Sequence, residues 1–132
     1  MANTFKLKIM TADSIKVDED AISITVKTID GKIELLVNHA DIVINTIPCV
    51  TEVVKANGER EEFFTSKGII GFKDNKLNFC CNSSEHKNEI DIERAKAAKE
   101  RAEKRLKDEN IDTKRAEAAL ARALTRLELK SK

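Results

Sequence analysis

Residues 91–107 read DIERAKAAKERAEKRLK, and this stretch marks an abrupt change in the character of the chain. From Asp91 to the end there is no glycine, no proline and no aromatic residue, while alanine, glutamate, lysine, arginine and leucine dominate. These residues are the strongest helix formers. The composition predicts two helices, over about residues 91–107 and 113–129. The short connection over residues 108–112 makes them antiparallel neighbours, and Asp112 is a suitable N-cap for the second helix.

The preceding part of the chain has the two-residue periodicity of β-strands. Apolar residues alternate with polar ones over residues 5–9 and again over residues 22–26, which is typical of strands with one buried face. Turn sequences separate the runs, and Asn57-Gly58 between two apolar pairs is the strongest hairpin signal in the chain. Many short strands separated by turns favour an antiparallel sandwich or barrel.

Composition and cysteine usage restrict the class of protein. The formal net charge is +1, so bulk charge does not favour nucleic acid or a membrane surface as a partner. No run approaches the ~18 apolar residues of a membrane span, and the alternating lysines of residues 1–10 are unlike a signal peptide. Aromatic residues make up only 4%, which predicts an aliphatic core. Cys49, Cys80 and Cys81 lack metal or redox spacing, which favours reduced thiols in the cytosol.

Each predicted helix carries a row of three arginines with the same spacing, seven residues and then four. The rows are Arg94, Arg101 and Arg105 in the first helix, and Arg115, Arg122 and Arg126 in the second. At about 100° per residue, each row falls within roughly 40° on its helix. When the helices fold antiparallel with their apolar seams together, both rows emerge on the same side. Such a row of guanidinium groups repels itself unless an anion lies there, and the planar fork of arginine suits phosphate oxygens.

The apolar seam that joins the two helices is thin. It consists of Ala95, Ala98, Ala102 and Leu106 in the first helix, and of Ala116, Ala119, Leu120, Ala123 and Leu127 in the second. Each buried methyl group contributes only about 0.8 kcal/mol, and two helices of this length are marginal alone. We therefore expect that the hairpin can detach or rearrange.

An ordinary solvated surface is the main alternative for the arginine rows, with Glu93, Glu100 and Glu117 as ion-pair partners. These acids lie more than about 90° around the helix from the rows, so pairing within a helix is poor. The chain has no glycine-rich phosphate loop. His39 and His86 lack a nucleophilic partner at any informative spacing, so we predict no catalytic residue and no metal site. No aromatic residue interleaves with the arginines, which disfavours binding of nucleic acid.

Three features occur along the chain in a recognisable order: a β-rich half, the loop Asn38-His39-Ala40, and the hexapeptide Ile90-Asp91-Ile92-Glu93-Arg94-Ala95 at the start of an alanine-rich hairpin. Together they resemble the epsilon subunit of bacterial F-type rotary ATP synthases. The hexapeptide is similar to the ATP-recognition motif of that family. The resemblance implies an N-terminal antiparallel β-sandwich over residues 1–86 and a C-terminal regulatory hairpin of two antiparallel helices over residues 87–132.

The function implied by the resemblance is that of a non-catalytic rotor subunit in the central stalk. Such a subunit couples ion translocation, typically of protons, to ATP synthesis at the cytoplasmic face of the cell membrane, without inserting into the membrane. Its sandwich would bind the gamma subunit and touch the c ring. Its hairpin would permit turnover when folded down and inhibit ATP hydrolysis when extended into the catalytic alpha/beta hexamer. No cofactor is obligatory, ATP is the expected regulatory ligand, and a purely structural coupler without a functional nucleotide site is the alternative.

The resemblance also implies which residues contact ATP. The matching positions are Glu85, Ile90, Asp91, Arg94, Ala95, Arg101, Arg115, Arg122 and Arg126. The phosphates would lie among the arginines, whereas Glu85 and Asp91 would orient arginines or accept hydrogen bonds from adenine or ribose. Contacts with the gamma subunit and the c ring are expected at Lys32, Glu34, Asn38 and His39.

Overall fold

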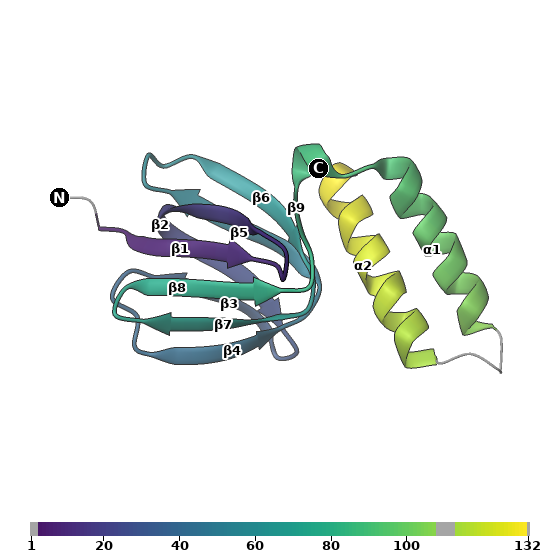
Figure 1. Cartoon of the computed structure of the whole chain (residues 1–132), viewed down its shortest axis with the longest axis horizontal. Coiled ribbons are helices and arrows are strands. Elements are labelled where there is room, and N and C mark those ends of the chain that lie inside the picture. Colours follow the sequence, from purple (N-terminus) through teal and green to yellow (C-terminus); the bar gives the residue numbers. More distant parts are fainter. Residues whose placement is uncertain (1–2, 108–112, 132) are drawn as a thin grey trace.

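The computed structural model describes residues 3–107 and 113–131, which form a β-sandwich followed by two helices (Figure 1). This confirms the predicted fold class. The strands are β1 (Phe5–Met10), β2 (Ile15–Thr28), β3 (Gly31–Leu36), β4 (Ile42–Thr46), β5 (Cys49–Lys55), β6 (Arg60–Thr65), β7 (Gly68–Lys73), β8 (Lys76–Cys81) and β9 (Ser84–His86). The helices are the short 3-10 helix η1 (Lys87–Glu89), α1 (Ile92–Leu106) and α2 (Thr113–Ser131). None of the described helices is long and apolar enough to cross a membrane.

The strands are hydrogen-bonded into one sheet in the order β4-β7-β8-β1-β2-β5-β6-β9, with β3 also paired to β2. The sheet forms two layers because β2 is 14 residues long and takes part in both. The first half of β2 pairs with β1, and its second half pairs with β3 and β5. The pairs are antiparallel except β1 with β8, which is parallel. The alternating sequence did not indicate this parallel pair.

Two tight turns lie at positions where the sequence predicts turns. Asn57-Gly58 lies between β5 and β6, which pair antiparallel, so the predicted hairpin is confirmed. Gly58 has φ of +88°, a value that glycine adopts without steric cost. Asp74 and Asn75 both have positive φ and join β7 to β8, because short polar side chains tolerate the left-handed region.

The core of the sandwich is not purely aliphatic, and the prediction from aromatic content was wrong on this point. All five phenylalanines of the chain are buried. Phe5 and Phe72 make an edge-to-face contact with ring centroids 5.4 Å apart. Low aromatic content misled the prediction because burial depends on position. Four of the phenylalanines lie in the core of the sandwich, and Phe64 is buried in a separate cluster with Leu129 of α2.

The hairpin meets the sandwich mainly through α2. α2 contacts β5, β6 and η1, and α1 packs against α2, so that α2 lies between the sandwich and α1 (Figure 1). The buried alanines Ala95 and Ala102 of α1, and Ala116 and Ala123 of α2, form the centre of the expected seam. The helices end within two residues of the expected positions. The proposed break over residues 108–112, with its N-cap, lies outside the described residues.

A second, small hydrophobic cluster fastens α2 to the sandwich. It contains Phe64 of β6, Ile90 after η1 and Leu129 of α2, with Val50 packed against them. Leu129 has no exposed surface, although the expected seam ended at Leu127. The last turn of α2, rather than its middle, is therefore the apolar anchor of the hairpin.

Candidate functional site

A polar pocket of about 300 Å³ lies where β9, η1, the first three turns of α1 and the last turns of α2 meet. Its lining residues are Glu85, Glu89, Asp91, Arg94, Ala95, Ala98, Arg101 and Arg126. Arginines from both helices thus line one cavity together with three carboxylates. The formal charges of the lining cancel. A phosphate ligand would therefore bind by exchanging carboxylates for phosphate oxygens around the guanidinium groups.

Arg126 is held in place from three sides. Its Nε donates to Oε1 of Glu85 at 2.8 Å, and its Nη2 lies 3.5 Å from Oγ of Ser83. Its Cζ lies 4.2 Å from the ring centroid of Phe64, which is a cation–π contact. The Arg126 and Glu85 side chains are only 22% and 28% exposed, so this ion pair is less screened by solvent than a surface pair.

Asp91 begins α1 and brings Arg94 to the pocket. Its backbone is extended, with φ −92° and ψ 109°, and its Oδ1 accepts a hydrogen bond from the Arg94 amide at 3.2 Å. Aspartate is a preferred N-cap because it satisfies an amide that has no partner within the helix. The amino end of the helix also carries a partial positive charge, which adds to that of the arginines.

The η1 turn connects the sandwich to the hairpin through a capping box. The amide of Asn88 donates to Nδ1 of His86 at 3.2 Å, and the amide of His86 donates to Oε1 of Glu89 at 3.1 Å. On the other side, Nζ of Lys130 in α2 donates to the carbonyl of Lys87 at 3.2 Å. Hydrogen bonds therefore hold the turn both internally and to α2 of the hairpin.

The structure brings together six of the nine residues expected to contact ATP: Glu85, Asp91, Arg94, Ala95, Arg101 and Arg126. Ile90 lies instead in the hydrophobic cluster with Phe64, because its side chain points away from the pocket into the α2–sandwich contact. Arg115 and Arg122 are not part of the lining. Their contact with a ligand stays a prediction.

Sequence reasoning did not single out Glu89 and the pocket alanine Ala98. A signal for Glu89 was present, because it follows His86 by three residues, the spacing of a capping box. Histidine is an uncommon N-cap residue, because the usual capping box begins with serine or threonine. Ala98 was assigned to the seam, but it is only half-buried and borders the pocket.

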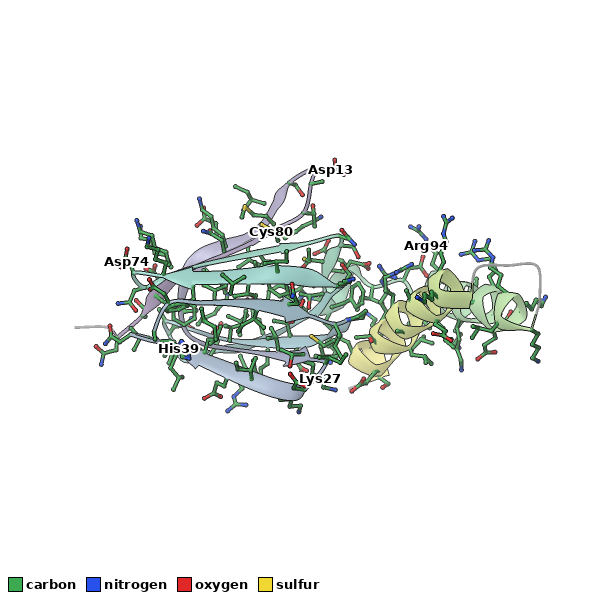
Figure 2. All side chains as sticks on the ribbon, turned by 90° about the horizontal axis from the view of Figure 1, so that it is seen from below. Asp13, Lys27, His39, Asp74, Cys80 and Arg94 are labelled. Carbon is green, nitrogen blue, oxygen red and sulfur yellow. The ribbon has the colours of Figure 1, made fainter. Side chains whose placement is uncertain are left out.

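The residues expected to contact protein partners lie away from this pocket. Lys32 and Glu34 are both exposed on β3. Asn38 has φ of 64° and exchanges hydrogen bonds with Asn75 in the β7–β8 turn, so it has a structural role in closing this end of the sandwich. His39 packs edge-on against Phe72, and Figure 2 shows it at the end of the sandwich remote from Arg94.

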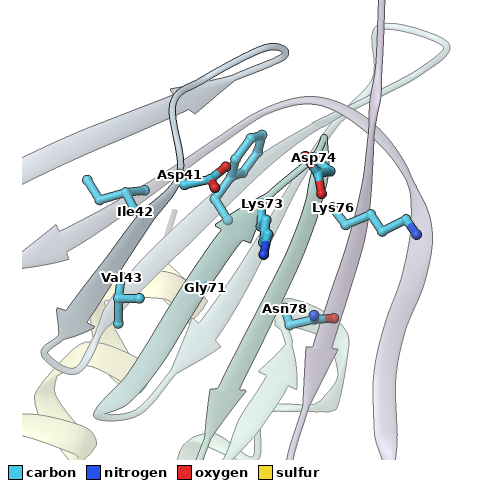
Figure 3. Close-up of a pocket in the computed structure, with 9 residues that line it drawn as sticks. Asp41, Ile42, Val43, Gly71, Lys73, Asp74, Lys76 and Asn78 are labelled. Atoms are coloured by element: carbon cyan, nitrogen blue, oxygen red, sulfur yellow. The ribbon is translucent and has the colours of Figure 1, made fainter.

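A larger hollow of about 550 Å³ lies on the outer face of β4, β7 and β8 (Figure 3). Its floor is at Gly71, and Val43 beside it is 75% exposed. The charged residues of this hollow, two lysines and two aspartates, come from neighbouring strands and loops without converging arginines. For an anionic ligand we therefore place the candidate site at the smaller pocket.

Within residues 3–107 and 113–131, no three His, Cys, Asp or Glu side chains are grouped so that they could hold a metal ion. The three carboxylates of the pocket are spread among its arginines instead.

Comparison with known proteins divides the chain into two matching parts. Residues 4–87 match the family described as ATP synthase, Delta/Epsilon chain, beta-sandwich domain, and residues 88–130 match the long alpha-helix domain of the same chain. The chain belongs to the ATP synthase delta/epsilon chain family. The boundary between the two matches falls within η1, at the joint described above.

Relatives in this family cover most of the chain. The ATP synthase epsilon chain of Clostridium acetobutylicum is 46% identical over 110 residues, which are 83% of each sequence. That of Clostridium novyi is 41% identical over 130 residues, which are 98% of this chain and 99% of the relative. The high coverage means that both the sandwich and the hairpin are shared with these epsilon chains.

Two solved assemblies contain chains of similar fold. One is a chain of the Euglena gracilis mitochondrial ATP synthase (OSCP/F1/c-ring), with a TM-score of 0.83, 23% identity, and coverage of 98% of this chain and 82% of that one. The other comes from the central stalk and c-ring of the Tetrahymena thermophila enzyme, with a TM-score of 0.62, 12% identity and 95% coverage of both chains. At these identities the similarity shows the fold alone.

Proposed function

We propose that this chain is a non-catalytic subunit of the central stalk of an F-type ATP synthase, bound at the cytoplasmic face of the cell membrane. It would contact the gamma subunit and the c ring through its sandwich and so help to couple ion translocation to ATP synthesis. Membership of the epsilon-chain family and the shared two-part architecture support this role. The central-stalk origin of one chain of similar fold agrees with it.

The regulatory part of the proposal is that ATP binds in the polar pocket of the docked hairpin. The observation that carries it is the convergence of Arg94 and Arg101 from α1 with Arg126 from α2 on one cavity. Guanidinium groups bind phosphate oxygens in pairs, and the amino end of α1 at Asp91 adds a favourable dipole. The carboxylates of the pocket then serve as acceptors for ribose or adenine donors.

Binding at this place would stabilise the docked hairpin. α1 is held through α2, so a ligand that bridges α1, α2 and β9 adds a direct connection between α1 and the sandwich. A ligand that binds only the docked state stabilises it by about 2.7 kcal/mol at a concentration one hundred times its dissociation constant. ATP would thereby favour the permissive docked state, and its depletion would favour the extended state that inhibits hydrolysis at the alpha/beta hexamer.

A purely structural coupler is the second candidate, and one observation favours it. Arg126 already has a carboxylate partner in Glu85 and an aromatic partner in Phe64. The docked hairpin is therefore electrostatically satisfied at this residue without a ligand. In that case the hairpin would brace the rotor, and ATP would have no effect on it.

Calorimetric titration of the full-length chain with ATP separates the two candidates. The regulatory proposal predicts saturable binding of one ATP that is weakened in Arg101→Ala and retained in Arg105→Ala, since Arg105 lies outside the pocket lining. The absence of heat and of any thermal shift at millimolar ATP would instead favour the structural coupler.

Inhibition is tested by removing all residues after Glu89 and measuring ATP hydrolysis by the reconstituted catalytic core. Hydrolysis should rise, and an unchanged rate would remove the inhibitory role.

A further inference from the structure

We propose that His86 and Glu89 are positioning residues for the polar pocket, and that the pocket is fully assembled only while His86 is neutral. Neither residue was among those expected to contact ATP. The consequence for ATP affinity rests on the proposed function, whereas the structural consequence concerns the joint between sandwich and hairpin itself.

The capping box makes the shape of this joint depend on one imidazole nitrogen. Nδ1 of His86 accepts the Asn88 amide, and Glu89 returns a bond to the His86 amide. The ring is held edge-on against Phe63, with centroids 5.3 Å apart and an interplanar angle of 80°. Nδ1 of the ring is thereby directed at the turn, and the strand that carries Phe63, β6, pairs with β9 at His86.

The same turn fixes two parts of the pocket. Glu89 caps the turn and also lines the pocket, and Asp91, two residues later, lines it as well and starts α1. Between them the side chain of Ile90 is buried, with 5% of its surface exposed. A change in the path of the turn would therefore move Glu89 and Asp91, and with Asp91 the Arg94 amide that it caps.

Protonation removes the acceptor on which the turn depends. Neutral imidazole has one acceptor nitrogen, and imidazolium has none, because both nitrogens then donate. Neither rotation of the ring nor a change of tautomer can restore the bond from the Asn88 amide. Histidine as a residue type ordinarily changes charge between pH 5 and 8, so this is the range in which the joint is tested.

Charged groups surround His86 on its own segment and on the elements packed against it. They are Glu85, Lys87 and Glu89 on β9 and η1, Glu61 on the adjacent strand β6, and Arg126 and Lys130 on α2. The carboxylates favour the imidazolium and the cations oppose it. Glu85 is held by Arg126, and Glu61 by Lys55, so two of the three carboxylates are already neutralised. The main effect of protonation is therefore the loss of Nδ1 as the acceptor for the Asn88 amide, which loosens the turn.

Heteronuclear NMR of the full-length chain between pH 5 and 8 tests the structural part. The Asn88 and Arg94 amide resonances should titrate together with the His86 imidazole. His39, which lies at the far end of the sandwich (Figure 2), is the internal control because its titration should not appear in these amides. In His86→Asn, whose side-chain oxygen accepts a hydrogen bond at every pH, the amide titration should disappear. Amides that do not follow His86, or that titrate equally in His86→Asn, would overturn the proposal.

Calorimetry with ATP at pH 7.5 and pH 5.5 tests the functional part. The phosphate itself changes charge near pH 6, so wild type is compared with His86→Asn at each pH. The ratio of wild-type to variant affinity should fall by roughly fivefold on going to pH 5.5, the size of effect expected for loss of an N-cap. An unchanged ratio would overturn the link to the pocket. Coupled amide titration without ATP binding at any pH would support the positioning of α1 and count against the nucleotide proposal instead.

Discussion

Glu85 of β9 and Arg126 of α2, 41 residues apart in sequence, are joined by an ion pair of 2.8 Å between Oε1 and Nε. The pair connects the sandwich to the hairpin, and both residues line the polar pocket. The same guanidinium group also packs on Phe64. One side chain thus serves both the docking of the hairpin and the proposed binding of ATP, so changes at Arg126 should affect the two together.

Replacement Arg126→Lys keeps the charge and removes the planar fork. It should lower the stability of the docked hairpin by about 1 kcal/mol and weaken ATP binding by about tenfold, because a lysine cannot contact Glu85, Phe64 and phosphate in the same geometry. Urea unfolding and calorimetry measure the two effects. Arg105→Lys is the matched control on an exposed position of α1. Equal behaviour of the two variants would show that Arg126 has no special role.

Replacement Leu129→Ala should detach the end of α2 from the sandwich. The Leu129 side chain is fully buried with Phe64 and Ile90, and truncating a buried leucine costs about 2–5 kcal/mol. The expected result is faster tryptic cleavage of the hairpin and a lower unfolding free energy. Leu124 is the control, because 44% of its surface is exposed. In Leu124→Ala both the cleavage rate and the unfolding free energy should stay near those of the wild type. If Leu129→Ala resembled this control, α2 would be anchored elsewhere.

The arginines should differ in their effect on ATP affinity according to their place relative to the pocket. Arg101→Ala removes a lining guanidinium and should weaken binding by roughly tenfold to a hundredfold, the range for loss of a hydrogen bond to a charged group. Arg115→Ala, outside the lining, should have a smaller effect. Calorimetric titration of both variants under identical salt provides the comparison. The reverse order would mean that the ligand lies further along the hairpin.

The cysteines should differ in reactivity in the folded protein. Burial raises the pKa of the Cys81 thiol to about 11, so at pH 8 only about one thousandth of it is the reactive thiolate. Cys49 is buried and Cys80 is exposed. Iodoacetamide at pH 8 should modify Cys80 alone, and all three cysteines should react in denaturant, as peptide mass spectrometry would show. The selectivity should persist until the pH approaches 11, and rapid modification of Cys81 at pH 8 would contradict its burial.

Features that depend on neighbours in sequence could be predicted from the sequence. Asn57-Gly58 specified its hairpin through backbone preferences that act locally, and the helix-forming composition after Ile90 placed both helices nearly correctly. The spacing of the arginines predicted that α1 and α2 would direct guanidinium groups to one side. Arg94, Arg101 and Arg126 line one pocket, whereas the other three arginines of the two rows lie outside its lining.

Features that depend on contacts between distant segments could not be predicted in this way. Leu129 looks like any leucine near the end of an amphipathic helix, and nothing in its neighbourhood shows that Phe64 and Ile90 bury it. The parallel pairing of β1 with β8 is invisible to a two-residue periodicity, which is the same for either direction. Glu89 gained its place in the pocket only through the turn that His86 caps.

We propose that guanidinium groups from both helices of the docked hairpin bind one ATP molecule. NMR titration of the full-length chain with ATP tests it most directly, through the arginine Nε–Hε resonances. Saturable shifts are expected for Arg94 and Arg101 of α1 together with Arg126 of α2, while Arg105 stays unchanged. Shifts confined to one helix, or no shift of these three at millimolar ATP, would contradict it.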